Sequence, residues 1–343
     1  MNWLITGGCG FVGCNLADAL LQQGASVALL DNLSRRGARE NLHWLRSRHG
    51  ADWPFFEIDI RHEQAVARIV RQLQPAHLAH LAGQVAMTTS LADPRLDFDT
   101  NAGGTLNVLE AVRIHSPATA IYFSSTNKVY GSLESLRHEE TPTRYVLPDH
   151  PHGLDESLSL DGSSPYGCSK LCAEQYCRDY HRMFGLRTVV FRHSSMYGGR
   201  QFATADQGWI GWFCQKALEQ AAGSREPIVI SGDGKQVRDV LHATDLVQVY
   251  LQTAERIDST AGRIYNIGGG MANSLSLVEL FALLGHLTGT AISFQSQPWR
   301  AADQKVFVAD YRRATAEFGW QPRVNHRQGL QEAIDWTREL MAA

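Results

Sequence analysis

Short apolar runs alternate with longer amphipathic stretches along the chain as far as residue 192. The apolar runs predict strands, and apolar positions three and four residues apart predict helices between them. Regular alternation of this kind, with right-handed crossovers, predicts an α/β fold built on a doubly wound parallel (Rossmann) sheet. The expected strands are Trp3–Thr6, Ser26–Asp31, Trp53–Asp59, His77–Leu81, Ala120–Ser124 and Thr188–Arg192, and the expected helices are Gly13–Gln23, Glu63–Gln74, Gly104–His115 and Pro165–Phe184.

The pattern changes after residue 192. Residues 198–207 are polar and rich in turn formers, and the stretches that follow predict helices at Gly208–Ala222, Leu275–Thr288 and Arg327–Met341 and a strand with a turn at Pro227–Gly234. We therefore expect one domain over residues 1–192 and a smaller C-terminal lobe over residues 193–343, interwoven with the first. The long segment 133–161 has no clear period and is expected to form a flap or insertion.

The composition limits the classes of partner. Lys and Arg number 32 and Asp and Glu 35, so the formal net charge is −3 and no single sign of charge dominates. This balance predicts no nucleic-acid or membrane partner, and no apolar run approaches the roughly 18 residues that a bilayer span needs. The six cysteines show no Cys-x-x-Cys spacing, and the N-terminal residues lack a basic leader. We expect reduced thiols, no metal site and a cytoplasmic protein.

A glycine-rich turn follows the first expected strand and opens the first helix. Gly7 permits the tight turn, Gly10 lets the backbone approach a pyrophosphate, and Gly13 allows the helix to pack closely on the strand. The helix N-terminus then presents amide groups to the phosphates. Phe11 and Val12 belong to the same dinucleotide-binding loop.

Asp31 ends the second expected strand, where a carboxylate hydrogen-bonds the adenosine ribose and repels a 2′-phosphate. This favours NAD⁺ over NADP⁺, although Arg35 and Arg36 lie close enough in sequence to neutralise an extra phosphate. The ends of the neighbouring strands supply the other expected cofactor contacts, and a structural role is equally open for the histidine among them. These residues are Asn32, Asp59, Ile60, Leu81, Ala82 and His193.

Tyr166 and Lys170 lie four residues apart, on one face of an expected helix. A nearby ammonium, together with a positive nicotinamide ring, favours the phenolate and is expected to lower the pKa of Tyr166, which can then accept a hydroxyl proton. Thr126 follows the fifth expected strand, at the sheet edge where such folds bind ligands. Together with the glycine loop, these three expected catalytic residues fit reversible hydride transfer at a carbinol carbon.

Five segments resemble the extended short-chain dehydrogenase/reductases that act on nucleotide sugars, and the resemblance extends over essentially the full chain. It rests on Ser125–Gly131, Ser164–Lys170, Phe191–Phe202, Asp206–Lys216 and Gly234–His242. The resemblance implies that Thr126, Tyr166 and Lys170 carry the catalytic roles and that Tyr166 and Lys170 also contact the cofactor. It further implies a tightly bound, recycled NAD⁺, a CDP-linked 3,6-dideoxyhexose as substrate, and a homodimer or homotetramer.

The two residues after Thr126 help to choose among the reactions of this family. Its dehydratases carry an Asp-Glu pair there, whereas this chain has Asn127-Lys128, neither of which is a carboxylic acid. We therefore expect epimerisation, at C2 of the sugar, through a transient 2-keto intermediate that receives the hydride on its other face. A 4-epimerase or a dehydrogenase on the same fold remains open, and a non-catalytic nucleotide-sugar sensor is the alternative from another class.

The smaller lobe is expected to bind the nucleotide-sugar substrate. Arg238 and Arg300 are suited to pair with its diphosphate, because the guanidinium group matches phosphate geometry. Further expected contacts come from both domains, with ordinary structural roles as the alternative for each. They are Gln84, Asn127, Lys128, Arg200, Gln201, Gln207 and Lys216.

Overall fold

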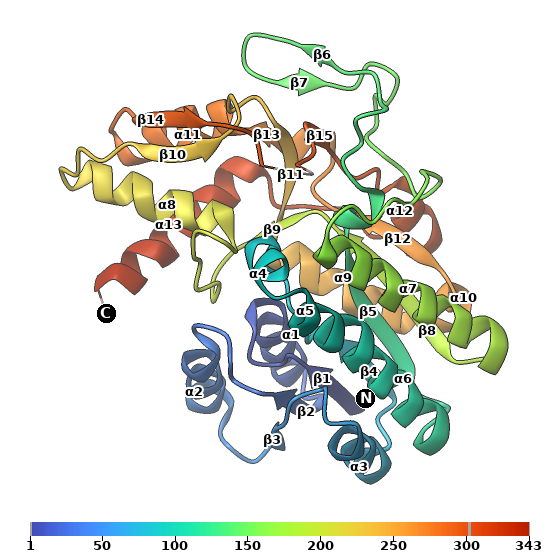
Figure 1. The fold of residues 1–343 in the computed structure, drawn as a ribbon. Helices are drawn as coiled ribbons and strands as arrows, with labels where there is room; N and C mark the ends of the chain where they lie inside the picture. The colour runs from blue at the N-terminus through green and yellow to red at the C-terminus, as the bar shows by residue number, and fades with distance from the viewer. Residues whose placement is uncertain (1, 301–302, 343) are drawn as a thin grey trace.

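A computed structural model describes residues 2–300 and 303–342. Its largest element is a seven-stranded parallel sheet with the strand order β12-β8-β5-β4-β1-β2-β3 (Figure 1). The order reverses direction between β1 and β4, as in a doubly wound fold, and the expected fold class is confirmed. The strands are β1 (Asn2–Thr6), β2 (Ser26–Asp31), β3 (Phe55–Glu57), β4 (His77–His80), β5 (Ala120–Thr126), β8 (Arg187–His193) and β12 (Ile264–Ile267).

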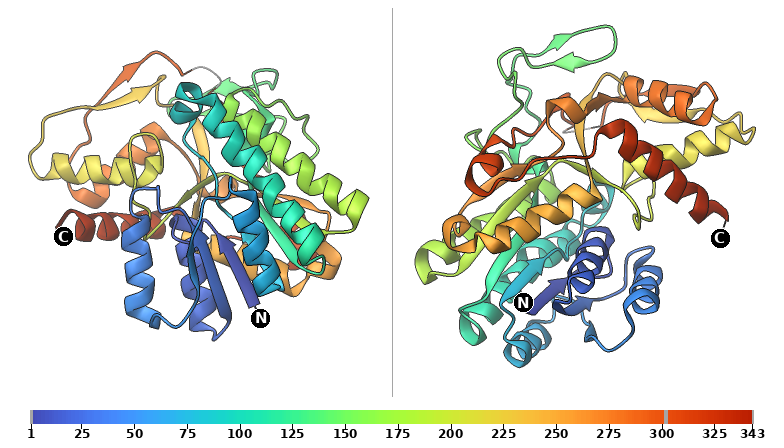
Figure 2. Two further views of the ribbon diagram at one scale, coloured as in Figure 1. Left: turned by 60° about the horizontal axis from the view of Figure 1, so that its bottom comes forward. Right: turned by 180° about the vertical axis from the view of Figure 1, so that it is seen from behind.

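Helices cover both faces of this sheet (Figure 2). One core cluster joins the sheet to α1 (Phe11–Gln22), α2 (Ala38–His49) and α9 (Ala243–Glu255). A second cluster on the opposite face joins it to α3 (Glu63–Leu73), α6 (Gly104–His115) and α7 (Pro165–Phe184). Because side chains pack on both faces, the central strands β1, β4 and β5 are buried at nearly every position.

Helix α7 shows how local sequence fixes an element that carries site residues. The Ser164 hydroxyl caps its N-terminus by accepting a hydrogen bond from the backbone N–H of Gly167 at 3.0 Å, and Pro165 occupies the first helical position. Gly185 ends the helix in the left-handed conformation, with φ of 71°. The observed bounds of α6 and α7 equal the expected ones.

Several helices were not expected from the sequence. Helix α2 has polar or charged residues at most positions, so its apolar stripe is narrow. Helices α4 and α5 are short and run into a π-helical turn at Asp99–Gly103. The unexpected helices are α2, α4 (Met87–Ala92), α5 (Pro94–Phe98), α9, α10 (Ile257–Thr260) and α12 (Arg312–Phe318).

The smaller lobe packs short strands against three helices around its own core. Strand β11 (Val237–His242) lies between β13 (Ser274–Ser276) on one side and β15 (Val306–Phe307) and β9 (Ser195–Tyr197) on the other, while β10 (Ile228–Ser231) pairs with β14 (Phe294–Gln297). The helices are α8 (Trp209–Ala221), α11 (Leu277–Thr288) and α13 (His326–Ala342).

The chain returns from the smaller lobe to the large sheet. Strand β12 pairs with β8 at the sheet edge, and α9 packs on α1. The two lobes are therefore interleaved in sequence, and a division at residue 192 stays a prediction.

The segment 133–161 forms a hairpin that reaches over the smaller lobe (Figure 1). Its strands are β6 (Glu139–Glu140) and β7 (Tyr145–Val146). The Arg144 guanidinium pairs with the Glu279 carboxylate, and the Tyr145 hydroxyl donates to Asp233 at 2.5 Å. These contacts fix the hairpin to the smaller lobe, which also carries most of the expected substrate residues.

The described residues include no helix that has both the length and the apolar character of a bilayer span. All six cysteines are free thiols, and only Cys168 is exposed.

Candidate active site

The carboxyl ends of four parallel strands meet at one edge of the large sheet. Thr6 of β1 pairs in register with His80 of β4, and Thr126 of β5 pairs with His193 of β8. The side chains of Thr6 and His80 are also joined, with 2.7 Å between the hydroxyl and Nδ1. The glycine loop and the expected catalytic residues therefore open onto the same edge.

The glycine loop has no room for side chains at the positions where it turns. Gly7 has φ of +69°, and a Cβ there would lie 2.6 Å from the backbone nitrogen of Ala82. A Cβ on Gly13 would lie 2.2 Å from the Gly7 carbonyl oxygen, whereas one on Gly10 would meet only that oxygen, at 3.3 Å. The loop thus lies close to the end of β4, and the backbone at Gly10 stays open to a ligand.

Two carboxylates lie beside the glycine loop, at the ends of the next two strands. Asp31 accepts the backbone N–H of Cys9 at 2.9 Å and of Leu33 at 2.8 Å, and burial raises its pKa. Burial also acts to raise the pKa of Asp59, but hydrogen bonds from Arg61 and Asn32 outweigh it and lower the pKa to about 2. Asp31 thus ends β2, and Asp59 follows the neighbouring strand β3.

Thr126 and Tyr166 come together from β5 and the first turn of α7. Burial raises the pKa of the Tyr166 phenol to about 12, while the Thr126 side chain acts to lower that pKa. The lowering expected from Lys170 together with a positive nicotinamide ring stays a prediction.

Lys170 reaches from the next turn of α7 to strand β5. Its ammonium donates to the carbonyl oxygen of Ser124 at 2.5 Å and lies 4.2 Å from the centre of the Phe123 ring. The side chain is 5% exposed, and burial lowers its pKa to about 8. Lys170 is thus held against the strand that ends at Thr126.

A buried ion pair supports these residues from behind. The Arg192 guanidinium donates to the Glu174 carboxylate at 2.5 Å, and the two side chains are 2% and 0% exposed. Glu174 also accepts the Ser125 hydroxyl at 2.7 Å, and Arg192 donates to the Tyr130 hydroxyl at 2.8 Å. The network ties α7 and β8 to the turn that carries Thr126.

Two of the expected substrate cations contact one carboxylate between the lobes, and the charge of a third acts on one of them. The same oxygen of Asp303 lies 2.8 Å from the Arg238 guanidinium and 3.4 Å from the Lys128 ammonium. Burial lowers the pKa of Lys128 to about 8, with the charges of Arg238 and Arg300 acting in the same direction. Arg300 itself donates to the Ser231 hydroxyl at 3.2 Å. Since two cations share one carboxylate and the charge of a third acts on Lys128, the cluster carries excess positive charge that suits a diphosphate.

Asn127 links the same two lobes. Its side-chain amide donates to Gln304 at 3.1 Å, and the Gln304 amide donates back to the carbonyl oxygens of Asn127 and Gly131. The Thr126 hydroxyl contacts the Asn127 amide oxygen at 3.3 Å. The segment that follows Thr126 is therefore held by the 303–305 segment of the smaller lobe.

Two further expected site residues are tied into structural contacts. The Gln84 amide donates to the Ala86 carbonyl and to Asp97, both at 2.8 Å. His193 is 2% exposed and contacts the Tyr250 hydroxyl at 3.1 Å, and burial lowers its pKa to about 3. Their roles toward a ligand stay predictions.

Four other residues that were expected to contact the substrate make their contacts away from Thr126 and Tyr166. The Arg200 guanidinium donates to Asn41 at 2.9 Å and lies over the rings of Trp44 and Trp336. The other three bond within their own lobe, Gln201 to Met196, Gln207 to Thr204, and Lys216 to Glu219.

Sequence reasoning missed several polar residues of the site. Asp97, Asn101 and Ser169 form a buried network beneath Lys170, and Asp303 completes the cation cluster. The signal for Asn101 lay in the glycine pair that follows it, since two glycines inside a helix indicate close packing or a local irregularity. Asp303 offered no local signal.

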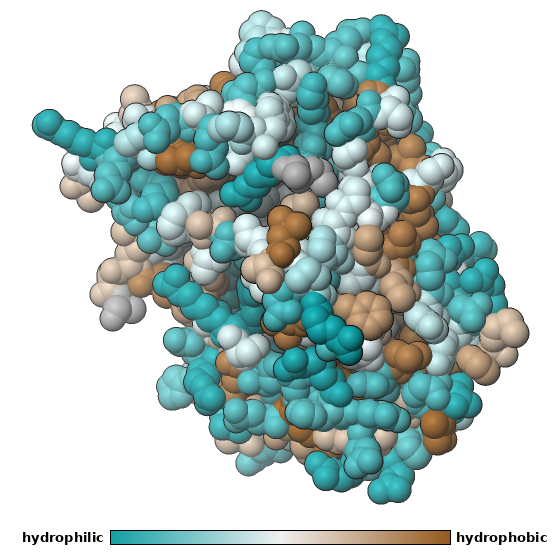
Figure 3. Space-filling model, in the orientation of Figure 1, coloured by the Kyte–Doolittle hydropathy of each residue, from teal (hydrophilic) through white to brown (hydrophobic). Residues whose placement is uncertain are grey.

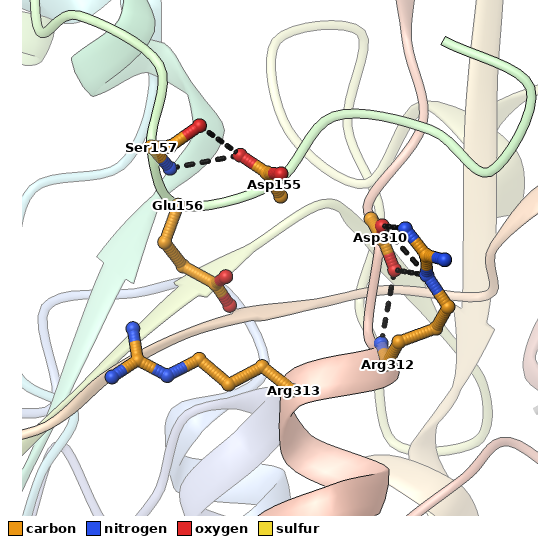
Figure 4. A pocket seen from close by; sticks show the side chains of 6 residues that line it. All are labelled: Asp155, Glu156, Ser157, Asp310, Arg312 and Arg313. Carbon is orange, nitrogen blue, oxygen red and sulfur yellow. Dashed lines mark hydrogen bonds and ion pairs between the residues drawn. The ribbon is translucent and has the colours of Figure 1, made fainter.

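A separate cavity of about 420 Å³ lies between the 155–157 segment and the start of α12 (Figure 4). In its lining, Arg312 pairs with Asp310 at 2.6 Å, and Asp155 accepts the backbone N–H of Ser157 at 2.9 Å. Glu156 accepts the backbone N–H of Asn266 at 2.7 Å. None of Thr126, Tyr166 and Lys170 lines this cavity.

Comparisons with known proteins agree with this geometry. Residues 3–268 match the model of the NAD dependent epimerase/dehydratase family. A curated relative, CDP-paratose 2-epimerase of Salmonella typhi, is 53% identical over 340 residues, which cover 99% of this chain and 100% of that protein. The crystal structure of UDP-glucose 4-epimerase from Thermotoga maritima with UDP-glucose is 30% identical, with a TM-score of 0.83 over 99% of this chain and 100% of that one. UDP-glucose 4-epimerase of Thermus thermophilus in complex with NAD is 29% identical, with a TM-score of 0.80 over 98% and 99%.

Proposed function

Since this chain belongs to the NAD dependent epimerase/dehydratase family, we propose that it epimerises a CDP-linked 3,6-dideoxyhexose at C2, the CDP-paratose to CDP-tyvelose type of reaction. The observation that carries the proposal is the similarity to the curated CDP-paratose 2-epimerase along nearly the whole of both chains. The resemblance to nucleotide-sugar enzymes, first indicated by the motifs, is confirmed by the family match.

The residues at the sheet edge fit a bound NAD⁺. The open backbone at Gly10 suits the pyrophosphate, and the carboxylate of Asp31 lies where it would accept the adenosine ribose hydroxyls. When bound, NAD⁺ accepts a hydride from the sugar and returns it, so that the net redox change of the reaction is zero. The chain's own residues hold the sugar and move the proton.

Tyr166 takes the hydroxyl proton of the reacting carbon and gives it back. In the proposed role, the phenol hydrogen-bonds to Thr126, which positions the same sugar oxygen. Burial, with a smaller effect from the charge of Asp97, keeps the pKa of Tyr166 high. The positive charge of a bound nicotinamide ring and of Lys170 would favour the phenolate at the moment of transfer.

Asn127 and Lys128 support epimerisation over dehydration. Elimination of water needs a carboxylic acid and a base beside the sugar, and the two side chains after Thr126 are an amide and an amine. The amide is bonded to Gln304 and the amine faces Asp303. The ketone can therefore turn within the site and accept the hydride on its other face without loss of a hydroxyl group.

The cation cluster would hold the diphosphate. Arg238 and Arg300 supply guanidinium groups from the smaller lobe, and Lys128 supplies an ammonium from the larger one. A diphosphate bound to all three would fix the sugar at the junction of the lobes, next to the Thr126 turn.

An apolar face supports a homo-oligomer. Six large apolar side chains on α4 to α7 are exposed, and part of this surface lies on the face that Figure 3 presents. Side chains of this size remain exposed in patches mainly where another protein surface covers them. They are Leu91, Phe98, Ile114, Tyr176, Met183 and Phe184. We propose that these helices pair with a second copy of the chain, and we expect a cytoplasmic enzyme because all six thiols are free.

A panel of nucleotide sugars tests the proposal. The purified protein is incubated with CDP-, UDP-, GDP- and dTDP-linked sugars, and each product is identified by NMR. We expect inversion at C2 of a CDP-linked 3,6-dideoxyhexose. Inversion at C4 of a UDP-sugar, net formation of NADH, or binding without turnover would instead identify a 4-epimerase, a dehydrogenase or a sensor.

A further inference from the structure

A buried carboxylate lies beside the Tyr166–Lys170 pair and belongs to no ion pair among the described residues. Asp97, on α5, is 0% exposed. One of its oxygens accepts the Ser169 hydroxyl at 2.5 Å, and the other accepts the side-chain amides of Gln84 at 2.8 Å and Asn101 at 3.2 Å. All three donors are neutral. A buried carboxylate costs several kcal/mol without a counter-ion, so this arrangement needs a reason.

The hydrogen bonds reach directly into the helix that carries the pair. Ser169 is the residue before Lys170, and its hydroxyl also lies 3.2 Å from the carbonyl oxygen of Tyr166. Asn101 bonds the same hydroxyl at 3.0 Å and accepts the backbone N–H of Gln84 at 2.9 Å. The network therefore joins the first turn of α7 to the loop after β4 and to the π-helical turn.

The other titratable groups around Lys170 carry no free negative charge. His80 of β4 and His193 of β8 have pKa values lowered by burial to about 3, and burial raises the pKa of the Cys177 thiol. Glu174 is neutralised by its pair with Arg192. Asp97 is the remaining carboxylate that acts on Lys170, and among the described charges it alone acts on Tyr166.

We propose that Asp97 is a positioning residue for Tyr166 and Lys170: its carboxylate anchors the first turn of α7 through Ser169 and supplies the unpaired negative charge beside the Lys170 ammonium. The inference rests on the proposed function in so far as this pair handles the proton. The role gives the buried charge a purpose, because a negative charge near Lys170 favours its ammonium form, whereas burial favours the neutral amine.

The charge can be measured at Lys170 without any substrate. The sequence has five lysines, so protein labelled with ¹³C at lysine Cε gives few signals, and Lys170→Met assigns one of them. In the NAD-loaded protein, Asp97→Asn is expected to lower the titration midpoint of Lys170 by on the order of one pH unit, the usual size of such shifts. The Lys128 signal, which reports a separate cluster, should keep its midpoint.

Asp99→Asn is the matched control. Asp99 lies two residues further along, is partly exposed and pairs with Arg95 at 2.8 Å, so its removal should leave the Lys170 midpoint unchanged. An Asp97→Asn protein with an unchanged Lys170 midpoint would overturn the proposal. This readout needs no turnover, so it can fail or succeed independently of the sugar that the enzyme accepts.

Ser169→Ala tests the anchor. It also tests the proposal in the case that the Asp97→Asn protein does not fold. It removes the hydroxyl that Asp97, Asn101 and the Tyr166 carbonyl contact, and it leaves the carboxylate in place. We expect turnover to fall at least tenfold with an unshifted pH profile and unchanged NAD⁺ affinity, because the pair is misplaced rather than recharged. Wild-type turnover in this variant would show that α7 needs no anchor at Ser169 and would overturn the proposal.

Discussion

Lys128 and Asp303 face each other from the two lobes, with 3.4 Å between the ammonium nitrogen and a carboxylate oxygen. The same oxygen lies 2.8 Å from the Arg238 guanidinium. Asp303 therefore occupies, from within the chain, the cations that we assign to the substrate diphosphate. A bound diphosphate and this carboxylate would compete for the same positive charge.

Removing the Asp303 charge should tighten binding of a diphosphate. In Asp303→Asn, Lys128 and Arg238 lose their internal anion, and we expect the affinity of the NAD-loaded protein for CDP to rise about tenfold, the effect of one charge-assisted contact. Calorimetric titration measures this change. Asp335→Asn, on the exposed surface of α13, should leave the affinity unaltered. Weaker binding by Asp303→Asn would mean that the carboxylate orders the cluster instead of competing.

The affinity for CDP should also depend on pH through Lys128. Burial, followed by the charge of Arg238, lowers the pKa of this lysine to about 8. Lys128 is positive below that pH and loses its charge as pH rises through it. A bound anion favours the charged form, so the dissociation constant should increase from about pH 8 upward. Lys128→Met should bind CDP more weakly at neutral pH and show no such rise. A rise of equal size in that variant would assign the titration to another group.

The sequence predicted those parts of the site that depend on local spacing. The glycine loop and the Tyr166–Lys170 pair follow from short motifs, and the bounds of α7 from its Ser164 cap and amphipathic pattern. Lys128 and Asp303 are 175 positions apart, and only the interleaving of the lobes brings them together. Burial raises the pKa of Tyr166 in the chain itself, and the motif could not predict this effect because it shows the neighbouring ammonium but not the burial of the phenol.

Tyr166→Phe should abolish turnover and leave the cofactor bound. The change removes the hydroxyl that takes the proton and retains the ring that packs at the start of α7. We expect a loss of at least a hundredfold in kcat, with NAD content after purification equal to that of the wild type. Tyr176→Phe, on an exposed face of the same helix, is the matched control. Substantial turnover in Tyr166→Phe would remove this residue from the proton path.

Arg192→Met should destabilise the protein strongly. It leaves Glu174, which is 0% exposed, without its cation, and breaking a buried pair in this way costs about 3–5 kcal/mol. Urea unfolding of the NAD-loaded protein measures the change. The double variant Arg192→Met/Glu174→Leu removes both charges and should recover most of the lost stability. If the double variant is as unstable as the single one, packing rather than the unpaired charge sets the cost.

The proposed reaction transfers the C2 hydrogen as a hydride, and isotopic labelling of that hydrogen shows whether it does. A CDP-linked 3,6-dideoxyhexose carrying deuterium at C2 is converted in ordinary water, and the unlabelled sugar is converted in deuterium oxide, with NMR of both products. We expect that the C2 deuterium is retained in the first product and that no solvent deuterium enters C2 in the second. Exchange of the C2 hydrogen with solvent would contradict it, because the hydrogen would then leave as a proton and not as a hydride.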